Sequence, residues 1–316
     1  MPAAPEGAGG PDTPALTLVV PAYNEAARLH EGFERLRSAV GSAPLLARLE
    51  VLVVDDGSTD ATAELAAREL DSRLPGHVLR QPKRLGKRAA VRAGLLAARG
   101  ERVAFADADM AIDPAHLPAL LAALEDADVA VGSRAVAGHV DYGSALRTLA
   151  GRAFNRCVRV ASGVSLADTQ CGFKGFNRGP AQLLAHLLTT NGYAFDVELL
   201  WLTARLGLRT AVVPVTWIDV PGSKVRPAHD AARMLTDVIA ARRRHRCLVA
   251  VELGAHDGGT APPGAVRVTG RRGELLVAGI SQLAAVRRSV SPRSSVRSLS
   301  LDELVALGPI EVLPAA

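Results

Sequence analysis

Val103-Ala-Phe-Ala-Asp107-Ala-Asp109-Met110 is an apolar run that ends in two aspartates one residue apart. Side chains alternate between the two faces of a β-strand, so Asp107 and Asp109 are expected to point the same way. In an open parallel sheet, ligands bind at the carboxyl ends of the strands. Two carboxylates there suit Mg²⁺ or Mn²⁺, which complete their shell with substrate phosphates and water. A solvated acidic turn is the alternative for an isolated pair, and the flanking segments decide between the two.

Two similar units precede this stretch. Residues 16–20 and 50–54 are β-branched apolar runs, each followed by a polar segment and a helical pattern. Repeated strand–loop–helix units predict an α/β fold with a mostly parallel sheet flanked by helices. Asn24 is expected to cap the first helix, and Asp113 followed by Pro114 is expected to begin the helix after residues 103–110.

The usual glycine loops for nucleotides are missing from these turns. The first strand is not followed by G-x-G-x-x-G, and Gly86-Lys87 is not part of a Walker loop. Asp55 and Asp56, at the end of the second strand, can accept hydrogen bonds from a base or a ribose, or they can cap a helix; both readings stay open. The cations after Gly86 predict either an anion site at a helix N-terminus or a solvated basic face.

Composition narrows the function classes. Lys and Arg number 37 against 32 Asp and Glu, a net charge of +5, and the basic residues cluster in 80–102 and 242–246. Such clusters favour phosphate-bearing partners, while 3% aromatic residues argue against nucleic acid. No apolar run of about 18 residues is present, so no membrane span is expected. The cysteines are three in number, Cys157, Cys171 and Cys247, and no C-x-x-C occurs. This pattern indicates a reducing cytosol and argues against a disulfide framework and against a zinc site.

Three divisions of the chain are expected: a disordered tail over residues 1–14, a catalytic domain over 15–246 and a small C-terminal extension of unknown role over 247–316. Residues 229–246 predict an amphipathic helix that ends in Arg242, Arg243 and Arg244. Its apolar stripe either packs on the sheet or lies on an anionic membrane surface. The predicted location is therefore cytoplasmic, with peripheral membrane contact as an open reading.

Eight short segments, in this order and spacing, resemble family 2 glycosyltransferases with the GT-A fold, and more narrowly the dolichyl-phosphate β-glucosyltransferases and the bacterial polyprenyl-phosphate sugar transferases of cell-envelope glycan biosynthesis. Together they cover roughly residues 15–227. They are Val19–Glu25, Val53–Asp60, Gly86–Arg88, Phe105–Asp109, Gly132–Arg134, Asp168–Lys174, Ala194–Leu199 and Gly222–Lys224.

The resemblance implies a role for particular residues. Asp107 and Asp109 would hold the divalent metal, Asp109 would also be catalytic, and Asp168 would stand where relatives place a base. The other implied contacts are the base and ribose pocket (Pro21, Ala22, Tyr23, Glu25, Asp55 and Asp56), the nucleotide or diphosphate (Lys87 and Lys224) and the phosphate of a lipid acceptor (Arg134 and Arg147).

The predicted function is inverting, metal-dependent transfer of a hexose from a nucleotide diphosphate sugar to a polyprenyl or dolichyl phosphate, with glucose and UDP favoured. A phosphate acceptor is largely ionised at pH 7 and needs little help from a base. A soluble transferase that acts on a hydroxyl is the first alternative, and there Asp168 would be needed as the base. The second alternative, from another class, is a non-catalytic protein that binds sugar nucleotides or nucleic acid.

Overall fold

The structure is a computed structural model. It describes residues 13–71, 73–134, 166, 168–190 and 194–218, and beyond these only the short segments 236–237, 240–241, 248–252, 265–270, 273–278, 288, 295–299 and 311–312. Of the predicted tail, Thr13 and Pro14 are described, and the Pro14 carbonyl accepts a hydrogen bond from the Glu101 N–H at 3.0 Å. Most of the predicted helix over 229–246 lies outside the described residues.

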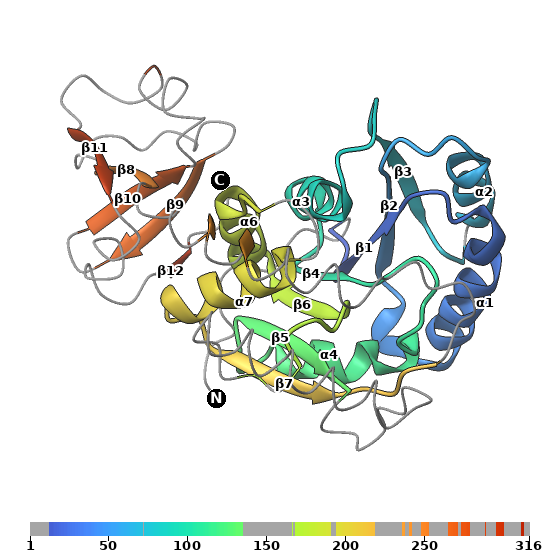
Figure 1. The fold of residues 1–316 in the computed structure, drawn as a ribbon. Coiled ribbons are helices and arrows are strands. Elements are labelled where there is room, and N and C mark those ends of the chain that lie inside the picture. The colour runs from blue at the N-terminus through green and yellow to red at the C-terminus, as the bar shows by residue number, and fades with distance from the viewer. Residues whose placement is uncertain are drawn as a thin grey trace.

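A seven-stranded sheet forms the centre of the fold (Figure 1). Its strand order is β3-β2-β1-β4-β6-β5-β7. β6 runs antiparallel to both of its neighbours, and the other neighbouring strands are parallel. The predicted, mostly parallel α/β sheet is therefore confirmed. The strands are β1 (Leu16–Ala22), β2 (Leu49–Asp55), β3 (Gly76–Arg80), β4 (Arg102–Phe105), β5 (Val129–Ser133), β6 (Lys174–Asn177) and β7 (Thr210–Pro214).

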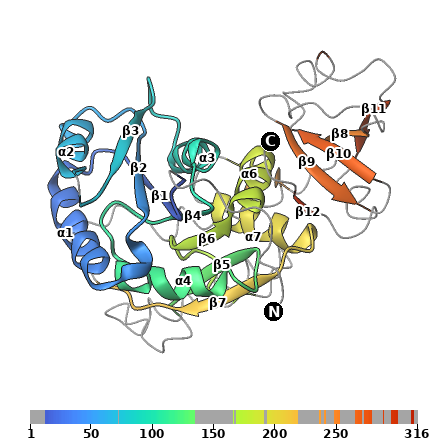
Figure 2. The same cartoon turned by 180° about the vertical axis from the view of Figure 1, so that it is seen from behind.

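Helices cover both faces of this sheet, as Figures 1 and 2 show from opposite sides. The first helical layer is α1 (Ala26–Ser42), α2 (Thr62–Glu69) and α4 (Leu117–Ala123), and the second is α3 (Lys87–Ala97), α6 (Arg178–Leu187) and α7 (Phe195–Arg205). Successive strand residues face opposite layers: Val20 packs with the first layer, and Val19 with the second. Because both faces are covered, β1 and β2 are buried along their whole length and read as continuous apolar runs. The described residues also include the short 3₁₀ helices η1 (Pro44–Leu46) and η2 (Pro114–His116).

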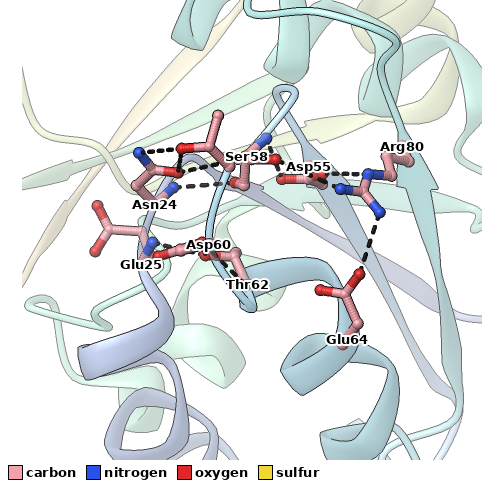
Figure 3. A network of polar contacts seen from close by, with 9 residues as sticks. Asn24, Glu25, Asp55, Ser58, Asp60, Thr62, Glu64 and Arg80 are labelled. Atoms are coloured by element: carbon pink, nitrogen blue, oxygen red, sulfur yellow. Dashed lines mark hydrogen bonds and ion pairs between the residues drawn. The ribbon is translucent and has the colours of Figure 1, made fainter.

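One predicted helix cap is confirmed and the other is wrong. Asp113 accepts a hydrogen bond from the Ala115 N–H at 2.9 Å and caps η2, which leads into α4. Asn24 does not cap α1. It has a positive φ of 52°, and its side chain accepts instead from the Thr59 N–H at 2.9 Å. The N-cap residue of α1 is Glu25, whose N–H donates to Thr62 Oγ1 at 2.9 Å (Figure 3).

The C-terminal segments form a second, antiparallel sheet with the order β11-β8-β10-β9-β12. It lies beside α6 (Figure 1), and its buried residues Val268, Leu275 and Val277 join the hydrophobic core that contains α6. The strands are β8 (Leu248–Glu252), β9 (Ala265–Gly270), β10 (Gly273–Ala278), β11 (Ser295–Leu299) and β12 (Glu311–Val312). Within the described residues, every helix is too short or too polar to cross a bilayer.

Candidate active site

The carboxyl ends of four strands meet at one edge of the large sheet. β1, β2 and β4 are parallel neighbours, and β5 shares the direction of β4 because both are antiparallel to β6. Tyr23 follows β1, Asp55 ends β2, Asp107 follows β4 and Arg134 follows β5. The topology therefore places residues from four separate predicted segments at the edge where open α/β sheets bind ligands.

Asp107 forms an ion pair with Lys87, with 2.5 Å between Oδ1 and Nζ. Lys87 is the first residue of α3 and follows Gly86, whose φ of 95° suits glycine. Burial by itself lowers the pKa of Lys87, but the carboxylates of Asp107 and Asp196 outweigh it and raise the pKa above its usual value. The ammonium therefore stays charged at neutral pH and offers a fixed cation at the end of β4.

Asp109 lies on a tight turn that follows β4. Its Oδ1 accepts from the Ala111 N–H at 3.2 Å, and its Oδ2 lies 3.3 Å from Nη1 of Arg28 on α1. The next residue, Met110, is buried and has a φ of 45°, in the left-handed region that non-glycine residues seldom occupy. Its N–H donates to the Asp107 carbonyl at 2.9 Å, so the turn holds both aspartates in place.

The chemistry of this turn fits a divalent metal. A Cβ on Gly172 would stand 2.5 Å from Asp107 Oδ2, so only glycine leaves this carboxylate its space. Among the described residues, one group of three His, Cys, Asp or Glu side chains lies close enough together to share an ion, namely His30, Glu34 and Glu69. Both of these glutamates already form ion pairs with Arg37. Two carboxylates without a third protein ligand are what Mg²⁺ or Mn²⁺ uses when a substrate diphosphate completes its shell.

Asp55 is fully buried and is held by its own turn (Figure 3). Its Oδ1 accepts from the Ser58 N–H at 3.1 Å, and its Oδ2 lies 3.2 Å from Arg80 Nε. Arg80 Nη1 also lies 3.3 Å from Glu64 Oε1, so the Arg80 guanidinium ties β2, β3 and α2 together. These contacts give Asp55 a structural role, and its predicted contact with a nucleotide stays a prediction.

Asp56 holds the loop that precedes α3. Its two carboxylate oxygens accept from the Leu85 and Gly86 N–H groups, each at 2.7 Å. In the same loop, the Arg84 guanidinium lies 4.2 Å from the centre of the Tyr23 ring. Asp56 thereby sets where Lys87 begins its helix. The remaining residues of the predicted base pocket are close by: Pro21 and Ala22 end β1, and Glu25 precedes α1.

Arg134 and Asp168, predicted to have separate roles, form one bidentate pair. Arg134 Nε lies 2.8 Å from Oδ2, Nη2 lies 2.9 Å from Oδ1, and the Arg134 N–H donates to Oδ2 at 3.2 Å. Burial raises the pKa of Asp168, but the bonds from Arg134 outweigh it and hold the pKa below its usual range. Asp168 is therefore an ionised carboxylate that orients Arg134 and is a weak base.

Sequence reasoning missed two charged residues beside these groups. Arg28 lies three residues after Glu25, a spacing that signals an ion pair on a helix, and its Nη2 lies 2.5 Å from Glu25 Oε2. Lys174 is fully buried on β6, where it is the register partner of Phe105 at the end of β4. Its Nζ lies 2.5 Å from Asp196 Oδ1 and 5.4 Å from the Phe105 ring centre. The predicted residues Arg147 and Lys224 lie outside the described residues.

A sequence model described as Glycosyl transferase family 2 matches residues 17–183. The dolichyl-phosphate beta-glucosyltransferase of Drosophila melanogaster is 38% identical over 238 residues, 68% of this chain and 71% of that protein. The Homo sapiens protein of the same name is 33% identical over 251 residues, 74% of this chain and 76% of that protein.

The fold also resembles a solved structure of glucosyl-3-phosphoglycerate synthase from Mycobacterium tuberculosis in complex with Mn²⁺, uridine-diphosphate-glucose and phosphoglyceric acid. The TM-score is 0.51 and the sequence identity 25%, over 72% of this chain and 78% of that one. The GT-A fold that the sequence predicted is confirmed.

Proposed function

Since the chain belongs to glycosyl transferase family 2 and is a glycosyltransferase, we propose that it transfers glucose from UDP-glucose to a dolichyl or other polyprenyl phosphate. The similarity to dolichyl-phosphate beta-glucosyltransferases over more than two thirds of both chains supports this acceptor. UDP-glucose in the Mycobacterium tuberculosis synthase supports this donor.

The observation that carries the proposal is the pair of partly exposed carboxylates, Asp107 and Asp109, at the end of β4 with Lys87 beside them. Asp107 and Asp109 would hold Mg²⁺ or Mn²⁺, which supplies charge neutralisation to the leaving diphosphate. Lys87 adds a permanent positive charge on the same side, where negative charge grows as the bond to the sugar breaks. The arrangement therefore favours departure of a nucleoside diphosphate.

In this proposal the acceptor binds near the end of β5, and the donor binds near the end of β4. An oxygen of the acceptor phosphate attacks C1 of the sugar from the face opposite the diphosphate, the bond to the diphosphate breaks, and the anomeric configuration inverts. This oxygen is already ionised at neutral pH, so no proton has to be removed. Arg134, fixed by Asp168, would position the phosphate. Arg147 and Lys224 keep their predicted contacts with the acceptor phosphate and the nucleotide as part of this proposal.

A second candidate is transfer to a small phosphorylated acceptor, because the Mycobacterium tuberculosis synthase was solved with phosphoglyceric acid. Incubation of the full chain with Mn²⁺ and radiolabelled UDP-glucose separates the two candidates. One arm contains undecaprenyl or dolichyl phosphate in detergent and the other contains 3-phosphoglycerate. The proposal expects label in the lipid phase, and label confined to the aqueous acceptor would contradict it. Asp109→Asn controls for metal-independent hydrolysis.

A further inference from the structure

Helix α1 touches the turn after β4 at three points along one face. Arg28, Gly32 and Arg35 are spaced so that they share this face. Arg28 Nη1 lies 3.3 Å from Asp109 Oδ2, and Arg35 Nη1 donates to the Met110 carbonyl at 3.3 Å. Between them, a Cβ at Gly32 would collide with the Ala108 carbonyl. The first layer of helices is thus packed closely against the turn that carries Asp109.

Arg28 is the residue of this face that reaches a carboxylate of the turn. Its guanidinium bridges two acidic groups, Glu25 at 2.5 Å and Asp109 at 3.3 Å. On the other side of the turn Lys87 pairs with Asp107. Each of the two carboxylates therefore has its own cation, supplied by a different helix. The side chains of Arg28 and Asp109 are 21% and 20% exposed, so an ion can reach this contact from solvent.

We propose that Arg28 is a stand-in cation for Asp109: it neutralises this carboxylate while no metal is bound and releases it when metal and donor arrive together. The inference rests on the proposed function, which assigns Asp107 and Asp109 to the metal. Arg28 remains paired with Glu25 after release, so its side chain does not have to leave α1. It acts on the metal through Asp109 and is a positioning residue.

The charges predict a coupling between metal and nucleotide. A metal ion that binds alone must compete with Arg28 for Asp109 and with Lys87 for Asp107. The two cations then lose these anionic partners. A diphosphate brings that charge with it, so each ligand should strengthen the binding of the other, as linkage requires. A partly exposed ion pair is worth up to about a factor of five in affinity, which sets the expected size of the effect.

Mn²⁺ titration of the full chain, followed by electron paramagnetic resonance with and without UDP, tests this role without any turnover. Arg28→Gln should bind Mn²⁺ alone about fivefold more tightly than the wild type, and UDP should add less to its affinity. Arg28→Lys, which keeps the charge, should restore the wild-type pattern. Arg35→Gln is the matched control, because it removes a neighbouring arginine that contacts the same turn at a carbonyl. Arg28→Met serves the same test should the glutamine variant fold poorly.

A purely structural role gives a different result. If Arg28→Gln and Arg28→Met bind Mn²⁺ alone no more tightly than Arg35→Gln does, the stand-in role is overturned. Failure of the proposed function looks different again: the wild-type chain would then bind no Mn²⁺ even with UDP present, and the metal assignment of Asp107 and Asp109 would fall together with the role of Arg28.

Discussion

The turns after β2 and β4 each carry two aspartates at the end of a buried strand, yet their surroundings differ. Asp55 and Asp56 are 0% and 2% exposed, and three backbone N–H groups bond to them. The side chains of Asp107 and Asp109 are 44% and 20% exposed, and their main partners are the side-chain cations Lys87 and Arg28. The buried carboxylates of Asp55 and Asp56 cannot leave their backbone amides without unfolding a turn. The partly exposed carboxylate oxygens that face Lys87 and Arg28 can exchange these cations for a metal.

Replacing an exchangeable carboxylate should have the largest effect on activity and almost none on the fold. Asp109→Asn keeps the size of the side chain and its contact with the Ala111 N–H, but it removes the charge offered to a metal. We expect the rate of glucosyl transfer to fall at least about 100-fold, in line with the loss of several kcal/mol of charge stabilisation. The melting temperature should stay within about 2 °C of the wild type. Full activity of this variant, or of the wild type in EDTA, would contradict the metal role.

The comparison predicts the opposite behaviour for the buried turn. Asp55→Ala leaves the Ser58 N–H without its acceptor and Arg80 without a buried anion, so it should lower the free energy of unfolding by about 2–3 kcal/mol. Urea denaturation followed by circular dichroism measures this loss.

Asp71 supplies the control for this stability experiment. It accepts from the Arg73 and Leu74 N–H groups in a turn of the same kind, but its side chain is 45% exposed. Asp71→Ala should shift the denaturation midpoint much less than Asp55→Ala. Equal shifts would mean that burial does not distinguish the two turns, and the structural reading of Asp55 would have to be given up.

The buried strands and the cap at Asp113 could be predicted from the sequence, because they depend on neighbouring residues. The apolar runs at 16–20, 50–54 and 103–106 formed buried strands because their composition suits a sheet covered on both faces, and topology alone then placed Asp55 and Asp107 at one edge. Asp113 caps η2 because its partner is two residues away. These predictions depend on residues close to one another in the chain.

Hydrogen bonds between residues far apart in the chain could not be predicted from the sequence in the same way. The N–H groups that hold Asp56 lie 29 and 30 residues later, and Arg134 is 34 residues from Asp168. The sequence predicts that Asn24 caps α1, but Ser58 and Thr62 of the turn at residues 58–62 supply the acceptors for the Asn24 and Glu25 N–H groups in its place. Whether a carboxylate is structural or exchangeable is settled by such contacts, and nothing in the spacing of the acidic residues reveals it.

The smallest effect is predicted for Asp56, where one substitution distinguishes a structural role from a direct contact with the nucleotide. Asp56→Asn keeps one acceptor oxygen, so one of the bonds from Leu85 and Gly86 should be lost, at a cost of about 1 kcal/mol in unfolding free energy. Because the carboxylate is occupied by the loop before Lys87, we expect the KM for UDP-glucose, the proposed donor, to rise less than about threefold. The order of activity with UDP-glucose, TDP-glucose and GDP-glucose should be the same as in the wild type. If Asp56 instead bonded the nucleotide base directly, Asp56→Asn would leave a buried polar group unpaired. The discrimination between the three donors would then change by several kcal/mol. Loss of that preference at nearly unchanged stability would therefore show that Asp56 contacts the nucleotide and does not mainly hold the loop. Asp56 would then be a ligand-binding carboxylate, as Asp109 is proposed to be.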